Sequence, residues 1–168
     1  MKMKKVKNYT LIVFAENKPG VLNKVTMLIR RKMYNVETIT AYKTETPGIS
    51  RITINVNDQE SSKVEQIVRQ LKKIVEVTEV INVTNQKPVV RELVLIKVKT
   101  NNGSRAQVSQ LANIFRGNIV DVSQDSMVVE ITGNPQKVES AICVFDDYEI
   151  LEIAGTGITA MERSNGEE

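Results

Sequence analysis

Several residue types on which enzyme chemistry depends are absent or scarce in this sequence. Its 168 residues include no histidine, no tryptophan and one cysteine, Cys143. Without histidine the chain cannot form a His-ligated metal site or supply the base of Ser-His-Asp and Cys-His catalysis. One cysteine forms neither a disulfide within the chain nor a cysteine-rich zinc site, and we expect an inert thiol at Cys143. Enzymes that work with carboxylates, lysine or arginine alone stay open.

Aromatic residues and net charge are also low. Aromatics make up 4% of the chain, so side chains on which nucleic-acid bases could stack are scarce. The 23 basic and 20 acidic residues leave a net charge of +3, too small for an affinity that depends on phosphate neutralisation. Arg105, Arg116 and the lysine-rich start could form a basic patch, but no aromatic residues are interleaved with them. We therefore expect no nucleic-acid partner.

Long hydrophobic runs are missing as well. The apolar stretch after the basic start, residues 11–15, is followed at once by Glu16 and Lys18. A secretory signal needs a longer apolar segment, and a bilayer span needs about 20 apolar residues. We expect a cytoplasmic protein that does not enter a membrane. The 41% of apolar and 26% of charged residues are otherwise typical of a globular protein.

The pattern of apolar residues predicts the order strand, helix, strand, strand, helix, strand in the first half. Residues 9–15 are apolar on both faces, as in a central strand that is covered on both sides. Helical stripes span residues 21–29 and 64–74. Further strands are predicted at residues 36–42, 52–56 and 75–83.

The same order returns after a polar stretch, residues 84–88, that ends in proline. Strands are predicted at residues 91–99, 119–122, 127–131 and 149–154, and helical stripes at residues 108–115 and 138–145. Gly117 is expected to end the first of these helices, while Asn134 and Pro135 are typical of the start of the second. Residues 162–168 form a polar tail.

The chain is therefore predicted to repeat a βαββαβ unit. Each such unit forms a four-stranded antiparallel sheet with both helices on one face, so we expect an α+β protein with two tandem ferredoxin-like domains, residues 1–84 and 85–168. The bare face of each sheet needs cover. Two units in one chain or a homodimer would supply it, which favours an oligomer.

The segment with the most chemical information joins the first strand to the first helix. The free N–H groups at a helix N-terminus attract carboxylates and phosphates. Gly20 allows a ligand to approach the backbone, the amide of Asn17 offers donors and an acceptor, and Val21 and Leu22 offer apolar walls. Together these groups suit a free amino acid. Taken alone, the same residues also fit a simple turn.

Other candidates have plainer interpretations. Asn35, considered alone, is typical of a left-handed residue that ends a helix. Arg51 lies opposite the apolar face of its strand and is expected to pair with an acid, a contact worth about 0–1 kcal/mol. The remaining acids share no evident face, so we interpret them as solvated charges and expect no metal site: Asp121, Asp125, Asp146 and Asp147.

Four segments resemble one family. Residues 11–25 resemble the opening of the ACT domain in the small, regulatory subunit of acetolactate synthase. Residues 33–39 are similar to that family's Gly-Tyr-Asn-Ile-Glu-Ser-Leu, and residues 50–54 to its Ser-Arg-Met-Thr-Ile. Residues 114–122 match the signature of its second domain. Two positions depart from the pattern, because Met33 replaces a glycine and Gly155 replaces an arginine.

The resemblance implies a protein without catalytic residues that regulates an enzyme. Family members bind the catalytic large subunit, raise its activity and make it sensitive to valine or another branched-chain amino acid. Thiamine diphosphate, magnesium and FAD belong to that large subunit, so no cofactor is expected in this chain. Residues 1–84 would be the effector-binding ACT domain, and residues 85–168 would help to activate the catalytic subunit.

The resemblance also implies where the effector binds. ACT domains pair side by side in a homodimer and hold the effector at their interface. One subunit would contribute Asn17, Gly20, Val21 and Leu22, and its partner Asn35 and Val36. Two alternatives are a free-standing tandem-ACT regulator of another target and an acylphosphatase-type hydrolase. The match at residues 114–122 disfavours the first, and the lack of a phosphate-binding glycine loop with a nearby arginine disfavours the second.

Overall fold

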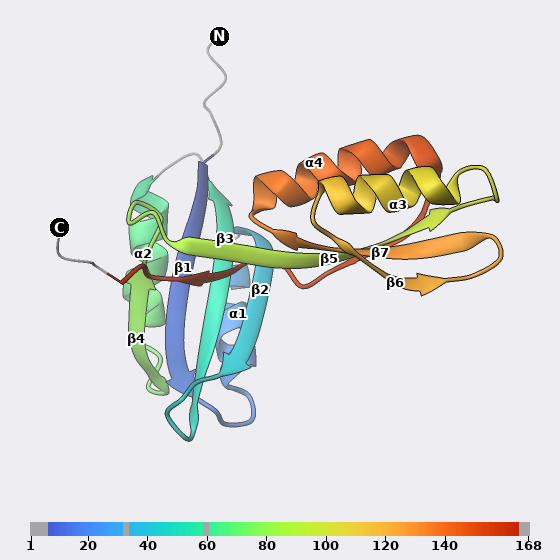
Figure 1. Cartoon of the computed structure of the whole chain (residues 1–168). Coiled ribbons are helices and arrows are strands. Elements are labelled where there is room, and N and C mark those ends of the chain that lie inside the picture. The colour runs from blue at the N-terminus through green and yellow to red at the C-terminus, as the bar shows by residue number, and fades with distance from the viewer. Residues whose placement is uncertain (1–6, 32–33, 59–60, 165–168) are drawn as a thin grey trace, which may run out of the picture. The chain divides into compact units, whose positions relative to one another are not determined.

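A computed structural model of the protein describes residues 7–31, 34–58 and 61–164. Its elements follow the predicted order, βαββαβ twice, with one further strand at the end (Figure 1). The chain divides into two compact units: a first unit up to Val89 that also contains the residues from Ile158 on, and a second unit, Val90–Gly157. The predicted α+β fold of two ferredoxin-like units is confirmed. The boundary between the units, however, lies after Val89 and not after residue 84 as predicted. The residues from Ile158 on belong to the first unit and not to the second.

The first unit holds a four-stranded antiparallel sheet in the order β2-β3-β1-β4. The chain runs through β1 (Lys7–Glu16), α1 (Val21–Arg31), β2 (Asn35–Lys43), β3 (Ile49–Asp58), α2 (Ser61–Leu71) and β4 (Val77–Asn82). Its central strand β1 has Leu11, Ile12 and Val13 fully buried, as its unbroken apolar run predicted. β2 and β4 lie at the edges of the sheet.

The main core of this unit lies between the sheet and its two helices. Leu11 and Val13 of β1 pack there with Val25 of α1 and Ile67 of α2. These helical residues come from the two apolar stripes that the sequence contains. Ile12 is equally buried, although its neighbours Leu11 and Val13 point toward the helices. Since side chains alternate along a strand, the face of the sheet opposite the helices is covered too.

The second unit repeats this plan with a sheet in the order β6-β7-β5-β8. Its elements are β5 (Val89–Lys99), α3 (Arg105–Ile114), β6 (Asn118–Val122), β7 (Ser126–Gly133), α4 (Pro135–Phe145), the short helix η1 (Asp146–Tyr148) and β8 (Ile150–Gly155). As predicted, α4 begins at Asn134, whose side chain accepts a hydrogen bond from the Lys137 N–H at 2.8 Å. Phe145 is fully buried in the core.

The end of the chain contains a strand that the sequence did not indicate. β9 (Thr159–Met161) pairs with β5, which gives that sheet five strands rather than the predicted four. A strand of three residues is too short to show an alternating pattern.

In the described part of the chain, none of the helices has the length and apolar character that crossing a bilayer requires.

Gly117 differs in its role from the prediction. The residue with positive φ at the end of α3 is Arg116, at +49°. A Cβ on Gly117 would lie 2.3 Å from Cδ1 of Ile131 and 2.6 Å from the backbone oxygen of Glu130. Glycine is needed there because the chain that follows α3 passes close to β7, not because φ is positive.

Gly117→Ala should therefore destabilise the protein. Overpacking against a backbone oxygen that cannot move away costs about 1–3 kcal/mol. Gly103→Ala is the matched control, because its Cβ would meet only the Asn101 side chain, at 3.3 Å. Urea unfolding should show the loss for Gly117→Ala and a change below about 0.5 kcal/mol for the control. Equal stability of both variants would contradict the close approach.

Candidate functional site

The turn between β1 and α1 is fixed by its own backbone. The Asn17 N–H donates to the Gly48 oxygen at 2.7 Å, and the Val21 N–H donates to the Lys18 oxygen at 3.3 Å. Gly20 has a φ of +86°, which side chains strongly disfavour, and a Cβ placed on it would meet no atom within 4 Å. The turn is therefore held in one conformation and leaves the space beside Gly20 open.

The first turn of α1 presents unused hydrogen-bond donors at this place. The first bond to a carbonyl before the helix runs from the Lys24 N–H to the Gly20 oxygen, at 3.0 Å. Within the described ranges, the N–H groups of Leu22 and Asn23 meet no acceptor, and the side-chain amide of Asn17 makes no hydrogen bond. These donors carry the positive end of the helix dipole, so they suit a carboxylate.

The apolar side chains of the turn differ in what they offer. Leu22 is 44% exposed and can contact a ligand. Val21 is 4% exposed, so its side chain is buried and out of reach of a ligand on the surface. Within one protomer, Leu22 is thus the apolar side chain of the turn that a ligand could contact, whereas Val21 could offer only its backbone.

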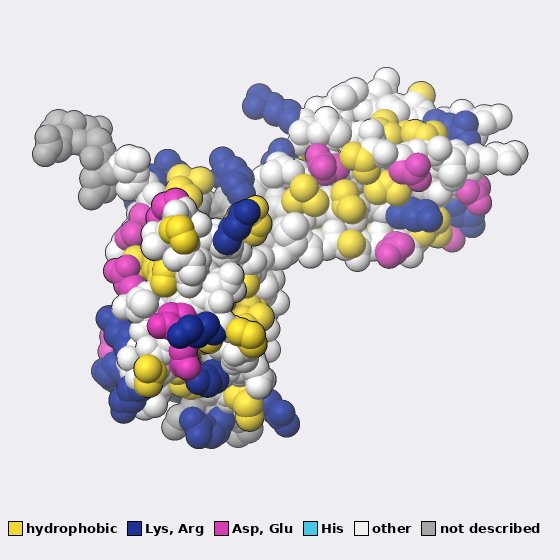
Figure 2. All heavy atoms as spheres, turned by 90° about the horizontal axis from the view of Figure 1, so that it is seen from below, with side chains coloured by type: hydrophobic (Ala, Val, Ile, Leu, Met, Phe, Trp, Pro, Cys, Tyr) yellow, Lys and Arg dark blue, Asp and Glu magenta, His cyan; other side chains and the backbone are white. Residues whose placement is uncertain are grey.

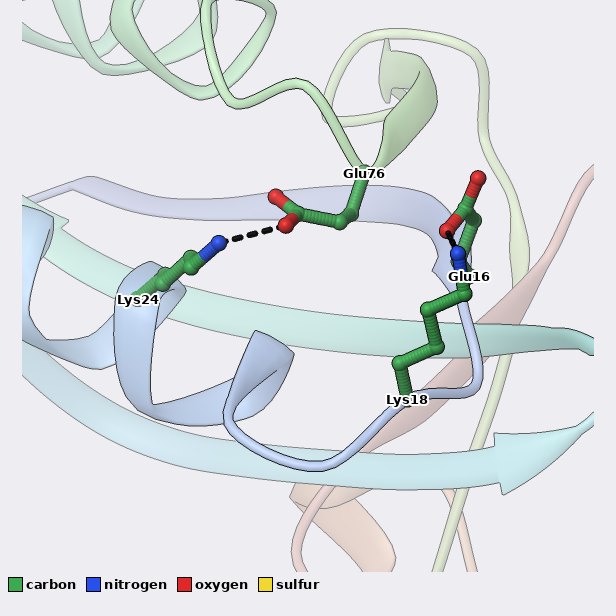
Figure 3. Close-up of polar contacts among 4 residues, drawn as sticks. All are labelled: Glu16, Lys18, Lys24 and Glu76. Atoms are coloured by element: carbon green, nitrogen blue, oxygen red, sulfur yellow. Dashed lines mark hydrogen bonds and ion pairs between the residues drawn. The ribbon is translucent and has the colours of Figure 1, made fainter.

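Charged side chains around the turn are paired (Figure 3). Lys18 contacts Glu16 at 2.5 Å, and Lys24 forms an ion pair with Glu76. The hydrogen bond to Glu16 raises the pKa of Lys18, and the one from Lys24 lowers the pKa of Glu76. Because Lys18 and Lys24 are each paired with a carboxylate, the groups left to attract an anionic ligand are the backbone N–H donors. A zwitterion such as an amino acid fits this balance better than a multiply charged anion.

The second predicted group, Asn35 and Val36, begins β2. Asn35 is exposed and already pairs with Asn57 in the sheet, so it is not the left-handed helix terminator that its sequence context alone suggested. Val36 is half-buried at the margin of the core. Both residues line a hollow of about 520 Å³ between α1 and β2, together with Thr26, Ile29, Arg30, Tyr34 and Ile39. Met33, which departs from the family pattern, lies outside the described residues.

The structure does not bring the two predicted groups together in one protomer. Asn17, Gly20 and Leu22 lie at the start of α1, and Asn35 and Val36 follow its end. An eleven-residue helix is about 16 Å long, too far for one amino acid to reach both groups. β2 is an edge strand, so within the described first sheet its outer side pairs with no other strand of that sheet. A single site that uses both groups needs a partner protomer.

Two further features of the described residues do not add to this set of groups. A hollow of about 530 Å³ is lined by Lys24, Met27, Leu28, Arg30, Arg31 and Ile74 and contains none of the predicted site residues. Across the described ranges, His, Cys, Asp and Glu side chains form no cluster of three or more that could hold a metal ion. On the face in Figure 2, cations and anions are interspersed, which fits the low net charge.

A set of polar contacts that the sequence did not indicate lies on the face of the first sheet opposite the helices. Arg51 was expected to pair with an acid, but its Nη2 donates to the Ala160 oxygen at 2.5 Å. Its guanidinium also lies over the Phe14 ring, 5.2 Å from the centroid. Burial lowers the pKa of Arg51. No local pattern could reveal a partner that lies over 100 residues away.

Comparison with known proteins supplies the family. Residues 91–164 match the family model described as the small subunit of acetolactate synthase, and residues 11–79 match the "AHAS small subunit-like ACT domain". The acetolactate synthase small subunit of Bacillus subtilis is 43% identical over 161 residues, which cover 96% of this chain and 91% of that protein. The chain belongs to the acetolactate synthase small-subunit family.

Other members of the acetolactate synthase small-subunit family agree over nearly the whole chain. The probable small subunit of Archaeoglobus fulgidus is 43% identical, covering 94% of this chain and 98% of that protein. The crystal structure of the small subunit from Thermotoga maritima superimposes with a TM-score of 0.87 at 40% identity, covering 95% of this chain and 99% of that one. The match includes both units, which an isolated ACT domain would not give.

Proposed function

We propose that this small subunit binds a branched-chain amino acid, with valine as the first candidate, between two copies of its ACT domain. The observation that supports this best is the pair of unused N–H groups on Leu22 and Asn23, next to the free amide of Asn17. The donors would hold the effector carboxylate, and the Asn17 side-chain oxygen would accept from its ammonium group. Leu22, and Val36 of the second copy, would contact the aliphatic side chain.

Effector binding would then regulate a catalytic large subunit of acetolactate synthase. This chain would activate the large subunit and make it sensitive to feedback inhibition by the bound amino acid. Thiamine diphosphate, magnesium and FAD would belong to the large subunit, and the small subunit would supply no catalytic group. A regulatory effect of 10- to 100-fold needs only about 1.4–2.8 kcal/mol of differential binding, within reach of a few hydrogen bonds and one buried isopropyl group.

Calorimetric titration of the small subunit with valine, leucine and isoleucine tests the proposal, each with and without the large subunit. We expect valine to bind best, with a preference of about 1–3 kcal/mol, because the three side chains differ by about one methylene. Coupling between two binding events is reciprocal, so the large subunit should change valine affinity by the factor by which valine changes subunit affinity. Absence of heat with all three amino acids, together with unchanged acetolactate synthesis on adding this chain, would refute the proposal.

A further inference from the structure

The end of the chain is fastened to the first sheet by side chains of that sheet. We call residues 158–163 the strap. The hydroxyl of Thr40 donates to the Ile158 oxygen at 2.8 Å, and the Ile158 N–H donates to the hydroxyl oxygen of Thr38 at 3.4 Å. Thr38 and Thr40 both belong to β2, so one edge strand holds both backbone groups of a single strap residue. In Figure 1 the strap is the dark red segment that crosses the sheet on the side away from α1 and α2.

A buried asparagine fixes these contacts in place. Asn55 of β3 is 3% exposed; it accepts from the Thr10 hydroxyl at 2.8 Å and donates to the Thr38 hydroxyl oxygen at 2.9 Å. Thr38 therefore bridges the interior of the sheet and the strap. Buried polar groups are costly to leave unpaired, so this network specifies one position of the strap on β2.

Two more contacts fasten the strap along its length. Arg51 of β3 donates to the Ala160 oxygen at 2.5 Å, and Ala160 is 3% exposed. Nε of Arg163 donates to the Lys87 oxygen at 2.9 Å, within the first unit. The partners of the strap in these four hydrogen bonds all belong to the first unit.

The strap is also the continuation of the second unit. The chain leaves the second unit at Gly157, whose φ is +77°, and Ile158 is the first residue that belongs to the first unit. β2 carries Asn35 and Val36, the residues that a bound effector would contact from the second copy. A movement of β2 must therefore either carry Ile158 with it or break the bonds to Thr38 and Thr40.

We propose that the strap couples the effector site to the second unit: occupancy changes the position of β2, and Thr38 and Thr40 pass that change to Ile158. This inference rests on the proposed function, since it concerns the response to an effector and not its binding. Coupling requires an element with two arrangements that both sites bias, and in this proposal the β2–strap contact takes that role.

The test replaces the two hydroxyls that hold Ile158. Thr38→Val with Thr40→Val keeps the shape of both side chains and removes the bonds to the strap, together with the bond that Thr38 accepts from Asn55. The matched control is Thr78→Val, which removes a hydroxyl that donates to the Phe14 oxygen at 3.2 Å on β4, away from the strap. Valine affinity is measured by calorimetry, amide hydrogen exchange is followed at residues 158–161, and activation and valine inhibition are measured with the large subunit.

In the natural chain and in the control, valine should change exchange at residues 158–161 by about 10-fold and inhibit the complete enzyme. The double variant should bind valine within about 3-fold of the natural affinity and still activate, but lose both responses. Two results would overturn the coupling role. One is full inhibition of the double variant by valine, and the other is hydrogen exchange at residues 158–161 that valine does not change in the natural chain. If the natural chain binds no valine, the proposed function fails instead.

A second variant covers the case in which the double variant does not fold. Arg51→Met removes the donor to Ala160 but keeps an unbranched side chain over Phe14, and it leaves Thr38 and Asn55 unchanged. We expect this variant to keep its valine affinity, as the double variant does, while its maximal inhibition by valine falls at least 3-fold. Unchanged inhibition in this variant counts against the strap as the coupling element.

Discussion

Gly20→Asp should abolish valine binding, whereas Gly20→Asn should leave most of it. The two side chains have nearly the same size and both tolerate positive φ, so they share the backbone cost of replacing glycine at +86°. The aspartate adds a negative charge beside the donors that would hold the effector carboxylate. Two like charges about 4 Å apart repel by about 4 kcal/mol at an effective dielectric constant of 20. We expect the aspartate variant to bind valine at least 100-fold more weakly than the asparagine variant.

Calorimetry with valine measures this difference, and thermal unfolding serves as the control. Open space surrounds the position of a Cβ at Gly20, so both variants should fold and unfold at similar temperatures. Association with the large subunit should also persist in both, because the substitution alters only the turn. Equal valine affinities for the aspartate and asparagine variants would remove Gly20 from the site.

The sequence was informative where local pattern decides structure. The unbroken apolar run at residues 9–15 correctly predicted a central strand, because only a strand covered on both faces needs apolar residues on both. The turn chemistry of Pro19 and Gly20 placed the start of α1 at Val21, where the structure has it. The candidate site followed from the same turn, since unused donors at a helix start are a property of the backbone.

Long-range contacts could not be predicted in the same way. Arg51 was predicted to be a surface cation that pairs with an acid. Its partner is the backbone of Ala160, and the residues near Arg51 in the sequence do not indicate that contact. Val21 was predicted to contact the effector, but only the fold shows that its side chain turns inward. The sequence could not predict the strap, because β9 has only three residues. The hydrogen bonds between Ile158 and β2 also join positions that lie 118 and 120 residues apart.

A composite site between protomers makes a second strong prediction, which mixing of two defective variants can test. In Gly20→Asp dimers both sites carry the damage at the start of α1. In Asn35→Ala dimers both sites lose the side-chain amide at the start of β2. We expect valine affinity to fall about 10- to 100-fold, because a polar group of the bound valine is left without a hydrogen-bond partner. At a valine concentration equal to the natural dissociation constant, each homodimer should fill no more than about a tenth of its sites.

Mixed dimers should recover binding without any natural subunit being present. If each site takes the α1 turn from one protomer and Asn35 from the other, a mixed dimer has one doubly damaged site and one intact site. Random exchange makes half of the dimers mixed, so about a quarter of all sites should bind valine with natural affinity. A site contained in one protomer predicts no recovery at all, because every protomer in the mixture carries one of the two defects. Calorimetric stoichiometry after subunit exchange separates the two cases, and the separation of about 16 Å along α1 favours recovery.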